Sequence, residues 1–213
     1  MKHLKRQTIP KNWPIPRKGT AFVVRPISGE LPLLVVLRNM IKIAQNKKEV
    51  KKALHEKSIL VNNKIAHEEK FGLDLFDTVS IIPSKKHYRI DLAENGKFKA
   101  VEIKEPEANK KVSKIIDKKI LKKKQMQLNL RDGKNILTDI KCNVGDSALI
   151  NFKDKKIEKC LELKEKANAI VFAGKHAGKK GIIEKLIIER KMAIMKVGED
   201  KINVLIKQIM VIE

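Results

Sequence analysis

The stretch VFAGKHAGKKGII, Val171–Ile183, decides how the C-terminal part of this chain folds. It places three glycines, three lysines and a histidine between two apolar segments. Glycine adopts backbone conformations that side chains disfavour, and β-branched residues after the loop favour a strand. The stretch therefore predicts a glycine loop between two strands. The apolar segments that follow, up to residue 213, are interrupted at Gly198-Glu199-Asp200 and predict a small β unit over residues 167–213.

The loop departs from the phosphate loop of nucleotide-hydrolysing proteins. Three residues separate Gly174 from Gly178 where that motif needs four, and Lys180 follows Lys179 where it needs Ser or Thr. Two interpretations remain open. The loop is a backbone clamp for a polyanion, or it is a solvated hairpin tip, which would explain the lysines but hardly needs three glycines.

The net charge of the chain limits the kinds of partner that it can bind. The 213 residues include 48 Lys+Arg and 25 Asp+Glu, a formal net charge of +23. Such self-repulsion indicates a polyanionic partner, either nucleic acid or an anionic membrane surface. Because 42% of residues are hydrophobic, a disordered basic tail is excluded, and 4% aromatic residues argue against a series of stacking platforms for single strands.

Neither a membrane span nor a cysteine-based site is predicted. The longest early apolar run, LPLLVVL (Leu31–Leu37), is too short to cross a bilayer and lies too deep in the chain for a signal peptide. We therefore expect a cytoplasmic protein. Cys142 and Cys160 lack the spacing of a zinc site or a disulfide framework, and we expect ordinary buried thiols.

Residues 1–30 combine seven Lys/Arg with one acid and hold four of the seven prolines. Proline prevents regular helix, and the charge prevents a core of its own. We interpret this segment as a basic arm that wraps over another structure and docks on it. A frayed terminus is the alternative, but Trp13 and the apolar island Phe22–Val24 favour docking.

Residues 31–83 predict two short helices, a hairpin and a returning strand. Leu34, Leu37, Ile41 and Ala44 have the spacing of one helix face after Pro32. The second helix begins at the capping-box pair Asn46 and Glu49. Asn62-Asn63 then fits a tight hairpin turn, and FDTVSII (Phe76–Ile82) alternates as a strand does.

Residues 84–166 predict a small all-β domain. Turn signals at Asn95-Gly96, Asp132-Gly133 and Val144-Gly145-Asp146 separate short apolar segments at regular spacing. The stretch Ser113–Gln125 also fits an exposed helix, but we assign it to strands. The fold class is thus a multi-module α+β protein.

Three resemblances refine this prediction. NAIVFAGKHAGKKGII (residues 168–183) resembles the KOW motif, which implies an SH3-like β-barrel in an RNA-associated protein. LVNNK (Leu60–Lys64) and FDTVSI (Phe76–Ile81) resemble the S4-type RNA-binding module over residues 31–83, with Asn63 where that module usually has glycine. Five ordered segments, from HLKRQTIPKNWPIPRKGTAFVVRP (His3–Pro26) to VGDSALI (Val144–Ile150), resemble the small-subunit ribosomal protein S4e family of archaea and eukaryotes.

The S4e resemblance implies a structural protein of the small ribosomal subunit, bound to the 5′ body region of small-subunit ribosomal RNA beside neighbouring ribosomal proteins. It implies no enzyme, no cofactor and no metal. The last residues, MVIE, lack the basic tail of eukaryotic members and indicate an archaeal version. An RNA pseudouridine synthase would need a larger catalytic domain, and a transcription-elongation factor would not need residues 31–82 or the arm.

The residues that we predict to bind RNA lie in the arm, on the two helices, in the hairpin and in the glycine loop. They are Lys5, Arg6, Lys11, Trp13, Arg17, Lys18, Arg25, Arg38, Lys42, Lys51, Lys52, Lys64, Gly174, Lys175, His176, Gly178, Lys179, Lys180 and Gly181. Predicted domains are the arm (1–30), the S4-type module (31–83), the central β domain (84–166) and the KOW barrel (167–213).

Overall fold

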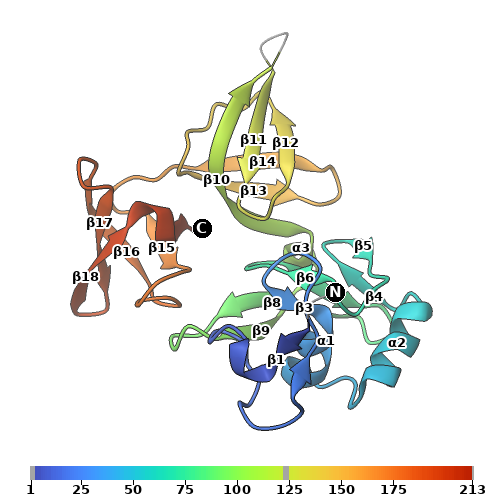
Figure 1. Ribbon diagram of the computed structural model, residues 1–213. Helices are drawn as coiled ribbons and strands as arrows, with labels where there is room; N and C mark the ends of the chain where they lie inside the picture. The colour runs from blue at the N-terminus through green and yellow to red at the C-terminus, as the bar shows by residue number, and fades with distance from the viewer. Residues whose placement is uncertain (1–2, 122–124, 213) are drawn as a thin grey trace. The chain divides into compact units, whose positions relative to one another are not determined.

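The protein is mostly β-structure with a few short helices, as the computed structural model in Figure 1 shows. The structure describes residues 3–121 and 125–212. The chain divides into two compact units. Unit 1 comprises Met1–Asp91 and Lys97–Asn109, and unit 2 comprises Leu92–Gly96 and Lys110–Glu213.

Unit 1 begins with the basic arm. Its strand β1 (Leu4–Lys5) pairs antiparallel with β2 (Phe22–Val23), and a 3₁₀ turn (Arg6–Thr8) follows β1. Trp13 is buried and its Nε1 donates a hydrogen bond to the carbonyl oxygen of Glu30, the last residue of the arm, at 3.0 Å. The arm contacts the rest of the unit at Asn12, whose carbonyl oxygen accepts a hydrogen bond from the Phe98 amide at 2.9 Å. Within unit 1 the arm is therefore docked, as Trp13 suggested, rather than frayed.

The run Leu31–Leu37 forms the centre of the unit 1 core. It begins as β3 (Leu31–Pro32), which pairs with β6 (Gly72–Leu73), and continues as α1 (Leu33–Val35) and a π-helical turn (Val36–Met40). All seven side chains are buried. A segment that is apolar on every side has no solvent face, so it is enclosed by other elements.

The predicted first helix is corrected in length. The expected face reached Ala44, but the helical turns end at Met40, and Lys42 has a positive φ of 60°. The spacing of Arg38 and Lys42 predicts that they lie one turn apart on the first helix, facing RNA, but the helical turns end between them. A wide π turn followed by a left-handed residue has no signal in the spacing of apolar residues, which explains the error.

The rest of unit 1 contains the predicted second helix and hairpin, together with two strands and a short helix from the segment that follows residue 83. Helix α2 (Lys47–His55) is followed by a five-stranded sheet in the order β5 (Lys64–Ile65), β4 (Ile59–Val61), β7 (Thr78–Ile81), β8 (Lys86–Leu92) and β9 (Phe98–Ile103), with the short α3 (Glu105–Ala108) after it. The predicted boundary between residues 83 and 84 falls between β7 and β8, which pair with each other.

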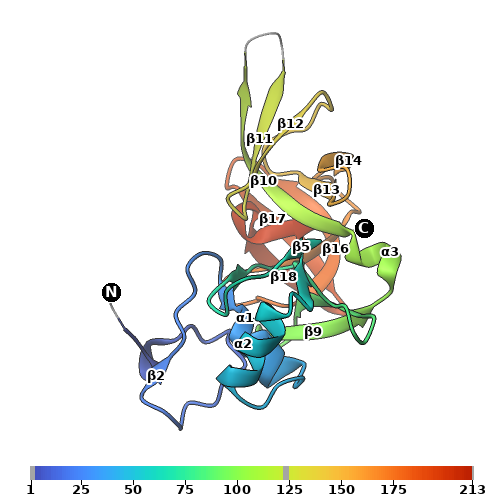
Figure 2. The ribbon, with the colours of Figure 1, turned by 90° about the vertical axis from the view of Figure 1, so that its right-hand side faces the viewer.

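The first sheet of unit 2 has the order β12 (Asn135–Thr138), β11 (Met126–Leu130), β10 (Lys110–Ile120), β13 (Ser147–Asn151) and β14 (Lys156–Leu161). The first half of β10 pairs with β13 and the second half with β11, so β10 and β11 form the hairpin seen in Figure 2. A register shift between Ile115 and Asp117 marks the change of partner. The strand assignment for residues 113–120 is confirmed, while residues 122–124 lie outside the described residues.

The second sheet of unit 2 contains the glycine loop. Its order is β18 (Asp200–Leu205), β17 (Met192–Val197), β16 (Lys180–Ile187), β15 (Asn168–Val171) and β19 (Ile209–Val211), all antiparallel. A register shift between Ile183 and Lys185 increases the local twist, and Ile183, Met195 and Ile209 fill the enclosed face. The predicted small β unit is confirmed, with its turn at Gly198 (φ +62°).

Candidate nucleic-acid interface

The arm presents most of its predicted cations to solvent. Lys5, Lys11, Arg17, Lys18 and Arg25 are all exposed. The arm is rich in proline, which disfavours regular helix, and these side chains are not buried in a core. Exposed ammonium and guanidinium groups can neutralise phosphates without prior rearrangement of the chain.

Two arm residues have structural roles instead. Trp13 is only 3% exposed and lies in the core of unit 1, so we remove it from the set of RNA-binding candidates. The Arg6 guanidinium donates hydrogen bonds to the carbonyl oxygens of Thr20 (2.7 Å) and Pro16 (2.8 Å) and to the Thr20 hydroxyl (2.9 Å). Arg6 therefore closes the turn between the two strands of the arm.

Helix α2 projects the next group of cations. Its start is fixed by the predicted capping box, in which the Asn46 side chain accepts a hydrogen bond from the Glu49 amide (3.0 Å) and Glu49 accepts one from the Gln45 amide (2.7 Å). Lys51 and Lys52 are exposed, although Lys51 lies 3.9 Å from the buried carboxylate of Glu69. Lys52 in turn lies 3.9 Å from the Glu56 carboxylate, so the basic surface of the helix is partly balanced by Glu69 and Glu56.

The first predicted helix contributes a half-buried Arg38 and an exposed Lys42. Arg38 donates from Nε to the Asn39 side-chain oxygen at 3.1 Å. The hairpin of β4 and β5 presents Lys64, also exposed, directly opposite Val61. Arg38 and Lys42 share a unit with α2 but do not lie on one helix face, because the helical turn ends at Met40.

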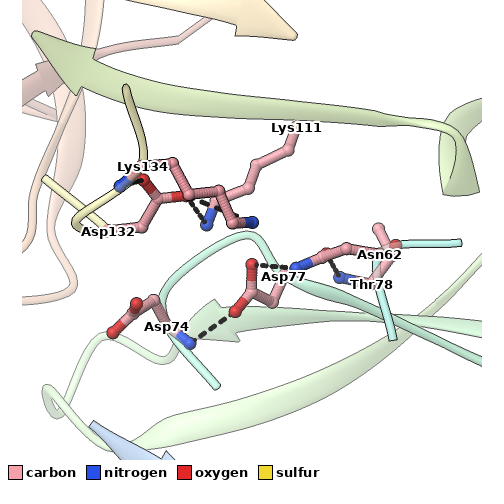
Figure 3. A network of polar contacts seen from close by, with 7 residues as sticks. All are labelled: Asn62, Asp74, Asp77, Thr78, Lys111, Asp132 and Lys134. Carbon is pink, nitrogen blue, oxygen red and sulfur yellow. Dashed lines mark hydrogen bonds and ion pairs between the residues drawn. The ribbon is translucent and has the colours of Figure 1, made fainter. Parts of the chain in front are cut away.

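A buried polar network fixes the hairpin turn, as the lower part of Figure 3 shows. Asn62 and Asn63 have φ of 49° and 62°, the left-handed pair that a tight turn needs. The Asn62 side chain donates to Asp77 (2.8 Å) and accepts from the Thr78 amide (3.0 Å). The second Asp77 oxygen accepts from the Asp74 amide at 2.7 Å. The turn is therefore tied to β7 by side chains as well as by backbone.

The glycine loop connects β15 to β16 and has a closed backbone. The Gly178 amide donates to the Val171 carbonyl oxygen (2.7 Å), and the Val171 amide donates to the Lys179 carbonyl oxygen (3.0 Å). Gly174 and Gly178 have φ of +89° and +92°, where side chains are strained. A Cβ on Gly178 would also collide with the carbonyl oxygen of Ala93, in the segment Leu92–Gly96 of the same unit.

The third glycine of the loop, Gly181, is required for a different reason. Gly181 lies in β16, and a Cβ there would collide with the carbonyl oxygen of Lys196 on the neighbouring strand. Lys175 and Lys180 are exposed, whereas His176 and Lys179 are half-buried and Gly178 is buried. Lys175 and Lys180 are thus the cationic side chains of the loop that reach solvent most, whereas the backbone at Gly178 is enclosed.

A buried ion pair in unit 2 involves residues that no sequence motif indicated. Lys111 Nζ lies 2.9 Å from Asp132 Oδ2 with both side chains almost fully buried, and Lys134 lies 3.6 Å from the same oxygen (Figure 3). Burial alone would raise the pKa of Asp132, but the two ammonium groups outweigh it and hold the pKa below its ordinary value. Alternating lysines on β10 gave no signal of which one points inward.

No sequence motif indicated a second buried lysine on β10 either. Lys114 Nζ donates to the carbonyl oxygens of Ile206 and Ile209, on the other sheet of unit 2. Burial, assisted by the charge of Arg131, lowers the Lys114 pKa from 10.5 to about 8. Arg131 in turn stacks over the Phe172 ring, 4.0 Å from its centroid. These cations join the two sheets and are not part of an exposed surface.

No metal-binding or membrane-spanning feature accompanies these surfaces in the part of the chain that the structure describes. Within residues 3–121 and 125–212, no three His, Cys, Asp or Glu side chains are grouped to hold a metal ion. No helix in those residues is both long and apolar enough to cross a bilayer. Burial raises the pKa of both Cys142 and Cys160, so neither thiol is activated as a nucleophile.

Comparison with known proteins decides the family. The family model "Ribosomal family S4e" matches residues 84–157, and the "RS4NT (NUC023) domain" model matches residues 1–29. The small ribosomal subunit protein eS4 of Methanocella arvoryzae is 34% identical over 197 residues, which cover 90% of this chain and 83% of that protein. The chain belongs to the eS4 family.

Further similarities agree with this assignment to eS4. The eS4 protein of Methanospirillum hungatei is 38% identical over 189 residues, covering 85% of this chain and 78% of that protein. The crystal structure of the 30S ribosomal protein S4e from Thermoplasma acidophilum has the same fold, with a TM-score of 0.73 at 23% identity, over 85% of this chain and 94% of that one. The predicted eS4 family is confirmed, and with it a structural ribosomal protein rather than an enzyme.

Proposed function

We propose that this eS4 protein is a structural constituent of the small ribosomal subunit in the cytoplasm, where it binds the 5′ body region of small-subunit ribosomal RNA and supports subunit assembly and translation. Ribosomal RNA and neighbouring ribosomal proteins are its partners. The observation that carries the proposal is the exposure of cations on the arm, α2, the hairpin and the glycine loop of a chain with net charge +23. Such surfaces bind the phosphate backbone and need no cofactor.

The proposal assigns parts of the interface to modules. Residues 1–30 act as a basic arm, and residues 31–83 act as an S4-type RNA-binding module whose hairpin turn is Asn62-Asn63. The predicted central β domain, residues 84–166, shares β8 and β9 with the sheet of unit 1, and residues 167–213 are proposed to form a KOW barrel of SH3 type. Support comes from the left-handed conformations at Asn62, Asn63, Gly174 and Gly178, which both kinds of module require in their turns.

Within these modules, the residues that we propose to contact RNA all have side chains that solvent reaches. The arm gives Lys5, Lys11, Arg17, Lys18 and Arg25; the S4-type module gives Arg38, Lys42, Lys51, Lys52 and Lys64; the loop gives Lys175, His176, Lys179 and Lys180. Gly174, Gly178 and Gly181 shape the loop, and Arg6 shapes the arm.

Binding of the full chain to transcripts of the 5′ and 3′ regions of small-subunit ribosomal RNA, measured against salt, tests this proposal. We expect tighter binding to the 5′ transcript. Replacing Lys52 and Lys64 with Ala should lower the slope of log affinity against log salt by about two units, roughly one for each phosphate that is no longer neutralised. The control is the Lys153 and Lys156 double alanine variant, exposed lysines outside the proposed surfaces.

The control variant should keep the slope of the parent protein. Equal affinity for the two transcripts would overturn the assignment to the 5′ region. Equal slope changes for the two double variants would overturn the assignment of the S4-type module as a binding surface.

A further inference from the structure

The arm of unit 1 encloses a groove of about 530 Å³ between its two strands and the turn that joins them. Four cationic side chains line it: Lys5, Arg6, Arg17 and Lys18. None of the described residues that line this groove is acidic. A concave site with cations on several sides has a strongly positive electrostatic potential, so it favours an anionic ligand.

The floor of the groove is rigid because Arg6 is fixed. Three of its five N–H donors bond to Thr20 and Pro16, which leaves donors on both terminal nitrogens for a ligand. Gly19 permits this arrangement. Its φ is +139°, and a Cβ at that position would lie only 3.0 Å from Arg6 Cζ. A guanidinium held in this way presents its remaining donors without a further loss of side-chain entropy.

One wall of the groove carries an exposed aromatic ring. Phe22 is 57% exposed although it is a large apolar side chain. It lies directly opposite Lys5 in the β1–β2 pair, so the two side chains project from the same face of the ribbon. The His3 ring lies beside it, with ring centroids 5.3 Å apart and a tilt of 50°. An apolar π-face is thus held next to a group of cations.

We propose that this groove binds one unpaired nucleotide of RNA, with its base stacked on Phe22 and its phosphate among Lys5, Arg17 and Lys18. The inference rests on the proposed function, because it specifies how the arm would engage ribosomal RNA. Phosphate recognition explains the cations, and base stacking explains why an aromatic ring is left exposed beside them. An acidic peptide would satisfy the cations but gives no reason for the exposed ring.

The test compares single-stranded and duplex RNA as probes of the full chain. Replacing Phe22 with Leu keeps an apolar side chain but removes the π-face. We expect the affinity for a twelve-nucleotide oligo(A) strand to fall by about five- to hundredfold, the usual range for one stacked base. Affinity for a fully paired twelve-base-pair RNA duplex should change by less than about twofold, because backbone contacts need no stacking.

A second variant separates stacking from folding. Phe22→Trp should restore the affinity for the oligo(A) strand, and its indole fluorescence should be quenched when the strand binds. The parent protein, whose Trp13 is buried, provides the background signal. Replacing Arg17 and Lys18 with Ala should lower the salt slope for the strand by roughly one unit, because the two side chains are proposed to share one phosphate.

Three outcomes would overturn the inference. One is an equal decrease of duplex and single-strand affinity in Phe22→Leu, another is no decrease at all, and the third is displacement of the oligo(A) strand by poly-glutamate at equal charge concentration. Failure of the proposed function looks different. In that case the parent protein itself would not prefer the 5′ transcript of ribosomal RNA, whatever residue occupies position 22.

Discussion

Lys114 is a buried lysine in a chain whose many lysines are mostly exposed. The residue is 5% exposed, and its ammonium group donates to Ile206 and Ile209. Its pKa is lowered from 10.5 to about 8, while the unfolded chain keeps the ordinary value. At a pH between about 8 and 10.5, the Lys114 amine is protonated in the unfolded state but largely neutral in the folded state. The contribution of Lys114 to the free energy of unfolding therefore rises with pH over this range.

This linkage gives a prediction for the Lys114→Met variant. Between about pH 8.5 and 10, the free energy of unfolding of the parent protein should rise relative to that of the variant by up to about 1.4 kcal/mol per pH unit. Denaturant unfolding at each pH measures both values. The matched control is Lys119→Met, at an exposed position of the same strand, for which the difference from the parent should stay constant. A constant difference for Lys114→Met as well would contradict the prediction.

Single elements differed in how well the sequence predicted them. The start of α2 and the turns at Asn62-Asn63, Asn95-Gly96, Asp132-Gly133 and Gly198 were predicted because local chemistry determines them: a side chain caps an amide, or a residue tolerates positive φ. The first helix was predicted too long, since burial on all sides leaves no periodicity that marks its end.

Other elements depend on contacts that are distant in sequence. Strand β14 and helix α3 were not predicted. Lys111 and Lys114 point inward to partners that are distant in sequence, the Asp132 carboxylate and the carbonyl oxygens of Ile206 and Ile209. Among the candidate site residues, the exposure of most lysines could be predicted, because charged side chains are rarely buried. The burial of Trp13 and the bonding of Arg6 could not, because each depends on how the arm folds back on itself.

The hairpin turn provides a prediction at the scale of an element, with two asparagines that differ only in side-chain contacts. Asn63→Gly should change the free energy of unfolding by less than about 0.5 kcal/mol, because glycine tolerates its φ of 62°. Asn62→Gly should destabilise by about 1–3 kcal/mol, since buried Asp77 loses a donor and the Thr78 amide loses its acceptor. Denaturant unfolding of the two variants measures both values, and equal effects would contradict the structural role of the Asn62 side chain.

At the scale of the whole molecule, folding and RNA binding respond to the same net charge in opposite directions. A formal charge of +23 repels itself in the compact state, so added salt should stabilise the free protein by screening that repulsion. The same ions compete for phosphates. If six or more phosphates are contacted, affinity for the 5′ transcript should fall by about 10³-fold or more between 50 and 200 mM KCl.

The melting temperature of the free protein should therefore rise over the salt range in which RNA affinity falls. Differential scanning fluorimetry and filter binding, carried out on the same samples, measure the two trends. Heparin at 50 mM KCl provides the control for the cause: as a polyanion that binds the folded protein, it should raise the melting temperature above the value that 200 mM KCl gives without it. A melting temperature that falls with salt would show that attractive ion pairs such as Lys111–Asp132 outweigh the repulsion between like charges. In that case the net positive charge of this eS4 protein would not destabilise its folded state.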